Sequence, residues 1–174
     1  PLTKAGFCKG LPPAFSFSLN FTGINRMHRY VPVANRRIVP YNRTSRKAAR
    51  YMNTLIELYD ERAIENILAA DMFRPQRIVY LCPGKIAQSR HWQETLRKFF
   101  LHRGWEPKLT FLDSSMFKAD HILRQLLSIS EQYPDCALDV TGGSDAALFA
   151  AGMFTAQTGV PAFTYSRKKN RFYD

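Results

Sequence analysis

Residues 139–145 have the sequence Asp-Val-Thr-Gly-Gly-Ser-Asp, in which a strand end turns through two glycines into an apolar helix. The unpaired amides in the first turn of a helix carry partial positive charge, and glycines let an anion approach the backbone. This pattern predicts a site for a phosphorylated ligand but does not indicate a reaction. The candidate ligand-binding residues are Thr141, Gly142, Gly143, Ser144 and Asp145.

Two other turns follow predicted strands, at Asp60-Glu61 and at Pro83-Gly84-Lys85. Ligands of open parallel sheets bind outside the carboxyl ends of the strands, usually where the strand order reverses. If the second and fourth strands lie near one another, Lys85 would offer a cation to a phosphate held by the glycine turn. Gly84 and Lys85 are therefore further candidates.

Each candidate also has a purely structural interpretation. Thr141 and Ser144 have the side chains that cap a helix, and paired glycines satisfy tight turns. A lone lysine such as Lys85 is more often solvated than functional. The basic cluster at 167–171 is typical of an exposed hairpin tip.

Catalytic and metal-binding motifs are largely missing from the sequence. The turn is neither a Walker loop nor the six-residue dinucleotide fingerprint. His91, His102 and His121 fall on predicted helices without metal-ligand spacing. Asp139 and Asp145 flank the turn but indicate no acid-base pair. We therefore expect no metal and no cofactor, and the sequence leaves open whether the chain is an enzyme.

The charge of the chain is concentrated in its first 50 residues. They hold ten of the 25 Lys and Arg residues and none of the 14 Asp and Glu residues, so residues 51–174 are nearly neutral. We interpret residues 1–51 as a basic leader that is disordered or is not native sequence, with Met52 as the true start. A nucleic-acid-binding arm and a targeting peptide remain alternative interpretations.

Residues 52–174 alternate between strand and helix patterns. Apolar runs of four to six residues indicate strands covered on both faces, and apolar stripes at offsets of three and four indicate helices. This order predicts an α/β, Rossmann-like domain with a mainly parallel sheet, flanking helices and a C-terminal β-hairpin. Strands are predicted over 55–59, 77–82, 108–112, 137–140, 161–165 and 171–173, and helices begin at Asp60, Ser89, Lys118 and Ser144.

The three cysteines, Cys8, Cys82 and Cys136, are far apart, odd in number and without metal-ligand spacing. Cys82 and Cys136 lie in apolar strands, where core packing is the simplest role. The absence of an apolar run of 18 residues or more argues against a membrane span. A cytoplasmic protein is expected.

The segment Ala137 to Ala150 resembles the Thr-Gly-Gly motif of CARF domains, the CRISPR-associated Rossmann folds. A strand directly after a Met, a helix, an apolar second strand and a closing hairpin that ends in Phe172-Tyr173-Asp174 extend the resemblance over roughly 52–174. These features look like the N-terminal sensor half of two-part CARF nucleases.

This resemblance implies a homodimer that binds a cyclic oligoadenylate made in type III CRISPR antiviral defence. It implies that Thr141, Gly142, Gly143 and Ser144 contact the ligand, and it adds Gly84 and Lys85 by their position alone. It also implies a fused C-terminal effector nuclease outside this chain. Some family members cleave their ligand slowly, and substitution of Ser144 and Lys85 would test such ring nuclease activity here.

Asp145 departs from the family pattern, because many family members have Lys or Arg soon after the glycine turn. A carboxylate beside phosphates lowers affinity unless it faces a hydroxyl, a lysine or solvent.

Two other functions compete with the CARF-like sensor. One is a Rossmann-like mononucleotide-binding protein or enzyme with a monomeric site. The other is a DNA-binding regulator that uses the basic leader, for which strongly salt-dependent affinity would be the sign.

Overall fold

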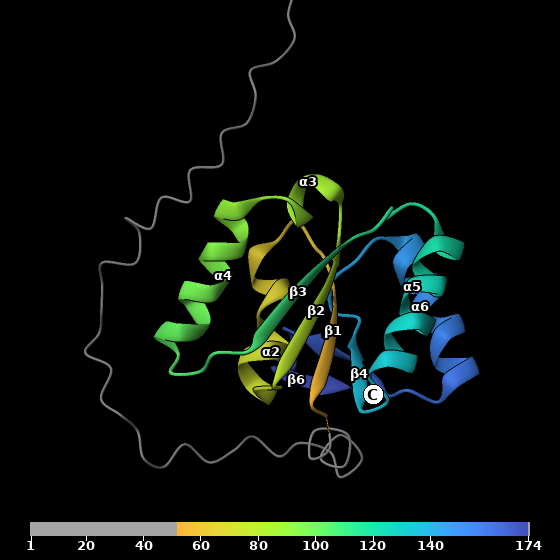
Figure 1. Cartoon of the computed structure of the whole chain (residues 1–174). Helices are drawn as coiled ribbons and strands as arrows, with labels where there is room; N and C mark the ends of the chain where they lie inside the picture. The colour runs from red at the N-terminus through yellow and green to blue at the C-terminus, as the bar shows by residue number, and fades with distance from the viewer. Residues whose placement is uncertain (1–51, 174) are drawn as a thin grey trace, which may run out of the picture. The chain divides into compact units, whose positions relative to one another are not determined.

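The computed structural model describes residues 52–173. The predicted leader, residues 1–51, therefore lies outside the described residues. Six strands form one sheet in the order β3-β2-β1-β4-β5-β6, with helices on both faces (Figure 1). The strands are β1 (Thr54–Leu58), β2 (Arg77–Cys82), β3 (Lys108–Asp113), β4 (Cys136–Asp139), β5 (Ala162–Ser166) and β6 (Arg171–Tyr173). The helices are the 3-10 helix η2 (Ala63–Asn66), α2 (Leu68–Phe73), α3 (Gly84–Ala87), α4 (Arg90–His102), α5 (Ala119–Gln132) and α6 (Asp145–Thr158).

The first five strands pair in parallel, and only β6 is antiparallel to its neighbour. The predicted α/β, Rossmann-like fold with a mainly parallel sheet and a C-terminal hairpin is therefore confirmed. Strand β1 is central, since it pairs with β2 on one side and with β4 on the other. The chain builds the sheet outward from β1 toward β3 and then from β4 toward β6, so the strand order reverses between β1 and β4.

Alternate residues of the buried strands supply two separate cores. On one face, Ile56, Val79 and Leu138 pack against α5 and α6. On the other face, Leu55 and Ile78 belong to the core that includes residues of α2 and α4. Figure 1 shows the two pairs of helices on opposite sides of the sheet. Because helices cover both faces of the sheet, the residues on both faces of each buried strand are apolar, and the strands appear in the sequence as continuous apolar runs.

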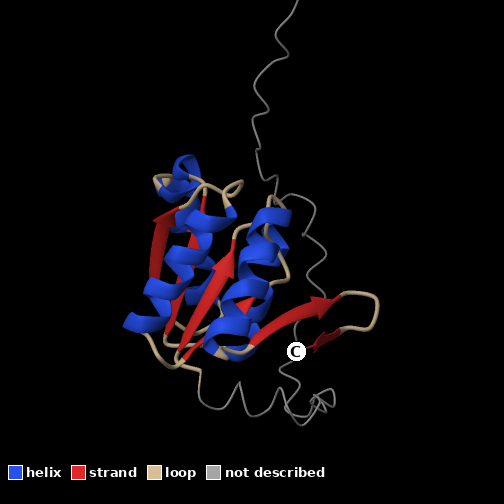
Figure 2. Ribbon diagram, turned by 90° about the vertical axis from the view of Figure 1, so that its right-hand side faces the viewer, coloured by secondary structure: helices blue, strands red, loops and turns tan. Residues whose placement is uncertain are grey.

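The hairpin of β5 and β6 extends beyond the helices at the edge of the sheet (Figure 2). Its turn places Asn170 at a φ of 49°, a left-handed conformation that asparagine tolerates better than most residues. Phe163 and Phe172 anchor the hairpin, because both are buried and both contact the ring of Phe73 in α2.

Two predicted elements differ from the structure. No helix begins at Asp60, because the Asp60 carboxylate accepts a hydrogen bond from the Arg62 amide and closes a turn. The Asn66 side chain then bonds both the amide and the carbonyl of Asp60, so that helical structure starts only at η2. Residues 84 and 85, predicted as a turn, begin the short helix α3.

Candidate ligand-binding site

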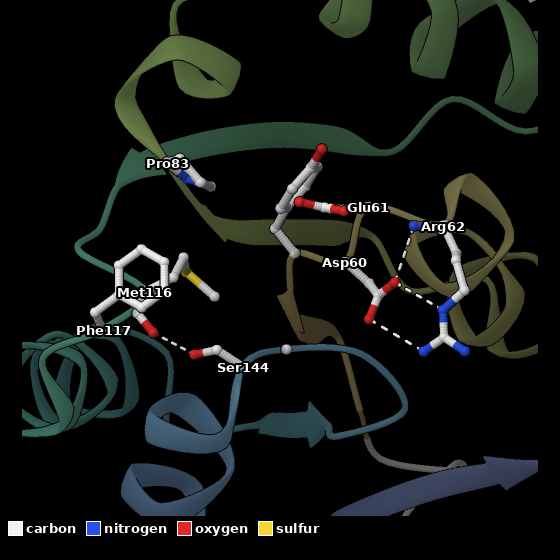
Figure 3. Close-up of a pocket in the computed structure, with 9 residues that line it drawn as sticks. Asp60, Glu61, Arg62, Pro83, Met116, Phe117 and Ser144 are labelled. Carbon is white, nitrogen blue, oxygen red and sulfur yellow. Dashed lines mark hydrogen bonds and ion pairs between the residues drawn. The ribbon is translucent and has the colours of Figure 1, made fainter.

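A pocket of about 430 Å³ opens at the carboxyl ends of the strands, beside the point where the strand order reverses. This is where ligands of open parallel sheets bind. Figure 3 shows its walls, which come from the loops after β1, β2 and β3 and from the glycine turn after β4. The lining residues are Tyr59, Asp60, Glu61, Arg62, Pro83, Met116, Phe117, Gly143 and Ser144.

The glycine turn is seated on the end of β1. A Cβ at Gly142 would lie 2.8 Å from the carbonyl oxygen of Leu58, so only glycine fits this approach without a shift of the backbone. Gly143 has a φ of 100°, a conformation that side chains with a Cβ rarely adopt. The backbone geometry therefore explains why glycine occupies both positions. Of the two, only Gly143 lines the pocket.

Ser144 joins the turn to two other parts of the chain. Its hydroxyl oxygen accepts a hydrogen bond from the Ala147 amide at 3.3 Å, which caps α6, and its hydroxyl donates to the carbonyl of Met116. The first helix after the turn is 14 residues long, and its N-terminus carries the positive end of the helix dipole. The pocket wall at Ser144 therefore favours an anion.

Thr141 is half-buried and does not line the pocket. Its amide donates to Asp139 Oδ1 at 2.7 Å, and its hydroxyl donates to the same oxygen. The Thr141 Oγ1 atom in turn accepts from the Tyr165 amide at 2.8 Å. The hydroxyl thus ties the turn between β4 and α6 to strand β5.

A chain of four charged side chains begins at the pocket, where Asp60 and Arg62 are part of the lining. Arg62 Nε lies 3.0 Å from Asp60 Oδ1, and Arg62 Nη1 lies 3.5 Å from Glu65 Oε1. Glu65 is buried and also pairs with Arg167 of the hairpin. In Figure 3 the Arg62 guanidinium lies on the side of Asp60 that faces away from Ser144. The bond from Arg62 lowers the pKa of Asp60, so this carboxyl group stays ionised.

Besides Thr141 and Gly142, three more predicted site residues lie outside the pocket lining. Lys85 is exposed on α3 and does not line the pocket, although Pro83, two residues earlier, does. Gly84 faces β3, because a Cβ there would lie 2.7 Å from Asp113 Oδ2. Asp145 is exposed in the first turn of α6.

Sequence reasoning missed the aromatic wall of the pocket. Phe117 lines it and is 89% exposed, which is unusual for a phenylalanine. Tyr59 lines it from the end of β1, where burial and then the charge of Glu61 raise the pKa of its hydroxyl. The one available signal was the apolar pair Met116-Phe117 inside an otherwise polar loop after the third strand.

Residues 52–173 contain no group of three or more His, Cys, Asp or Glu side chains that could hold a metal ion. Within the same residues, every helix is too short or too polar to cross a membrane.

No protein-family model matches the chain, and no curated protein matches it. Among solved structures, it is similar to Can2 from Sulfobacillus thermosulfidooxidans in complex with cyclic tetra-adenylate (cA4), with a TM-score of 0.61. The two proteins share a fold. Their sequences are 17% identical, and the match covers 72% of this chain and 34% of the Can2 chain. The chain thus spans about a third of the length of Can2.

Proposed function

We propose that this chain is a CARF-like sensor domain that binds a cyclic oligoadenylate at the pocket beside the glycine turn. The observation that carries this proposal is the position of the pocket, which opens at the strand-order reversal with the N-terminus of α6 in its wall. The shared fold with a protein solved in complex with cyclic tetra-adenylate supports the choice of ligand class.

The chemistry of the lining suits an adenine nucleotide. Backbone amides at the start of α6 would hold a phosphate, and the exposed ring of Phe117 would stack on a base. Asp60 and Glu61 supply acceptors for a ribose hydroxyl or for the amino group of adenine. Arg62 also lines the pocket, but its guanidinium is paired with Asp60 and lies on the side away from Ser144, so in this proposal the phosphate is held by the backbone amides.

A second copy of the chain would complete the site. A pocket of about 430 Å³ is in the range for one small ligand, so a ring of several nucleotides would span two copies. On α6, the apolar side chains of Leu148, Phe149 and Met153 remain exposed, and the exposed Gly152 lies between them. A helix that is apolar all round is normally covered, so we assign this stripe to a homodimer interface that begins at the pocket.

Control of a fused effector nuclease in type III CRISPR defence is part of the same proposal. It draws on the resemblance of residues 137–150 to the Thr-Gly-Gly motif and on the greater length of the Can2 chain. Slow cleavage of the ligand would be a secondary activity, with Ser144 as the pocket residue to substitute.

Calorimetric titration of the full chain with cyclic tetra-adenylate and cyclic hexa-adenylate tests the proposal, with ATP as the control ligand. The expected result is saturable binding of one ring per two chains and weak or no binding of ATP. Binding of ATP at one per chain, with no response to either ring, would contradict it and favour the mononucleotide-binding alternative.

A further inference from the structure

Two carboxyl groups lie side by side beneath the glycine turn, on the face of the sheet that α2 covers. Glu57 is in β1 and Asp139 ends β4, and the register pairs the two residues across neighbouring strands. Parallel strands lie about 4.8 Å apart, so paired side chains on one face must meet. Both residues are 1% exposed, and the charge of Asp139 acts on the Glu57 carboxyl group beside it.

These carboxyl groups are short of a hydrogen-bond donor. Glu57 Oε1 and Asp139 Oδ2 are enclosed, and neither oxygen accepts a bond from any group in the described part of the chain. One proton placed between the two carboxyl groups satisfies both oxygens at once. Without it, two acceptors would face each other in a low dielectric, which is costly.

The surroundings favour the protonated pair. Burial first and the charge of Asp139 second hold the pKa of Glu57 well above its usual range, and burial raises the pKa of Asp139 to about 6. The ionisable groups that face the pair are Tyr80 from β2 and Glu65 from η2. Tyr80 donates its proton to the Asn66 carbonyl, and Glu65 is paired with Arg167. Both groups are acids, so neither supplies a positive charge that would stabilise an ionised pair.

The same pair fixes the turn. With Asp139 Oδ2 bound to the proton of Glu57, Oδ1 is free to accept both hydrogen bonds from Thr141. Thr141 leads directly into Gly142, which is seated on the end of β1. A rotation of the Asp139 carboxyl group would therefore release the start of the turn that borders the pocket.

We propose that Glu57 and Asp139 share one proton and act as a positioning pair that holds the glycine turn in its ligand-binding conformation. The proposal rests on the proposed function for the nature of the ligand. Ligand affinity then depends on pH through Glu57 and Asp139, although neither residue lines the pocket. Loss of the shared proton places two charges next to each other, turns Asp139 away and loosens the turn.

The test uses the full 174-residue chain and two measurements. The first is independent of any ligand: the NMR shift and exchange protection of the Thr141 amide, followed against pH. The second is the affinity for cyclic tetra-adenylate over the same pH range. Glu57→Gln supplies a fixed N–H donor in place of the shared proton, and Glu94→Gln, on the exposed side of α4, is the matched control.

In the wild-type chain, we expect the Thr141 amide to titrate in one step and the affinity to fall about tenfold per pH unit above that step. Glu57→Gln should lack the step and bind equally well on both sides of it, whereas Glu94→Gln should behave as wild type. A Thr141 amide that does not titrate, or a step that survives in Glu57→Gln, would overturn the positioning pair.

The two proposals fail differently. If the Thr141 step is present and Glu57→Gln abolishes it, the positioning pair stands even when no cyclic oligoadenylate binds, and only the ligand is wrong. If the ring binds with an affinity that does not change with pH, and the NMR shift of the Thr141 amide does not change with pH either, the positioning pair is refuted. The sensor function then stands.

Discussion

The Ser144 hydroxyl donates a hydrogen bond to the backbone carbonyl of Met116, and this bond joins the first turn of α6 to the loop after β3. The two residues are 28 positions apart in the sequence and both line the pocket. One side chain therefore sets the distance between the anion-binding wall and the aromatic wall of the site.

Ser144 caps α6 and also holds the loop at Met116, and comparison with a serine that only caps a helix should separate these two roles. Ser144→Ala removes the cap of α6 and the bond to Met116, and we expect a loss of about 1 kcal/mol in the free energy of unfolding together with weaker ligand binding. Ser89→Ala is the matched control, because Ser89 caps α4 in the same way by accepting from the Trp92 amide, outside the pocket. Urea denaturation and calorimetry check both variants. Equal losses of affinity in the two would contradict a role for Ser144 in the site.

Phe117 should contribute to binding and little to stability. Its ring is 89% exposed, so Phe117→Ala leaves no cavity in the core, but it removes a stacking surface that is worth about 1–3 kcal/mol per base. Calorimetry should record a loss of that size with an unchanged unfolding midpoint. Leu101→Ala, at an exposed position of α4, should change neither quantity. Wild-type affinity in Phe117→Ala would show that no base stacks there.

The stripe on α6 predicts the oligomeric state. Phe149 is 65% exposed, and Phe149→Asp places a charge in the middle of the proposed interface. We expect light scattering to give the mass of a dimer for wild type and of a monomer for the folded variant. Met72→Asp adds the same charge to an exposed apolar position on α2 and should leave the dimer intact. If the wild-type chain is a monomer and still binds the ring with full occupancy, the proposed homodimer interface on α6 is wrong.

Stability should fall as the pH rises through weak acidity. The pKa of Asp139 is about 6 in the folded chain against 3.8 ordinarily, so the native state holds its proton more tightly than the unfolded chain does. This contribution is fully present below about pH 3.8 and is lost as the pH rises through about 6, a change of about 3 kcal/mol. The raised pKa of Glu57 acts in the same direction.

Urea denaturation at about pH 5 and about pH 7.5 measures this effect. The lowered pKa of Asp60 acts in the opposite direction but below its ordinary value of 3.8, outside this window. The double variant Glu57→Gln, Asp139→Asn should lose the dependence, and Glu94→Gln should retain it. An unfolding free energy that is equal or higher at the upper pH in wild type would refute the raised pKa values.

The fold was predictable from the sequence because its signals are local. The apolar run of β2 and the serine cap of α4 each depend on a few adjacent residues, and both lie where the sequence predicted. The helix expected at Asp60 failed because Asn66, six residues later, bonds the Asp60 backbone and holds it in a turn. Side-chain bonds of this kind leave no periodic pattern.

The site was predictable only in part, because it depends on which strands become neighbours. The turn at Gly143 and Ser144 and the loop at Asp60 were expected at one edge of the sheet, and the pocket contains all three. The insertion of β1 between β2 and β4 was not readable from the sequence. Neither was the start of α3 at Gly84, and Lys85 on this helix is exposed and outside the pocket lining. Glu57 gave no signal either, since one acidic residue in an apolar run does not reveal what lies on the next strand.

The central place of β1 also has a consequence for how the chain reaches its native state. Ile56 pairs with Leu138, so the two strands that support the glycine turn come from distant parts of the sequence. Contacts of such long range form late and slowly, because a large loop must close first. A chain still emerging from the ribosome, with β4 not yet made, has β1 and β2 but an unpaired β1 edge. The ligand pocket, whose walls follow β1, β2, β3 and β4, can therefore exist only after these four strands have come together.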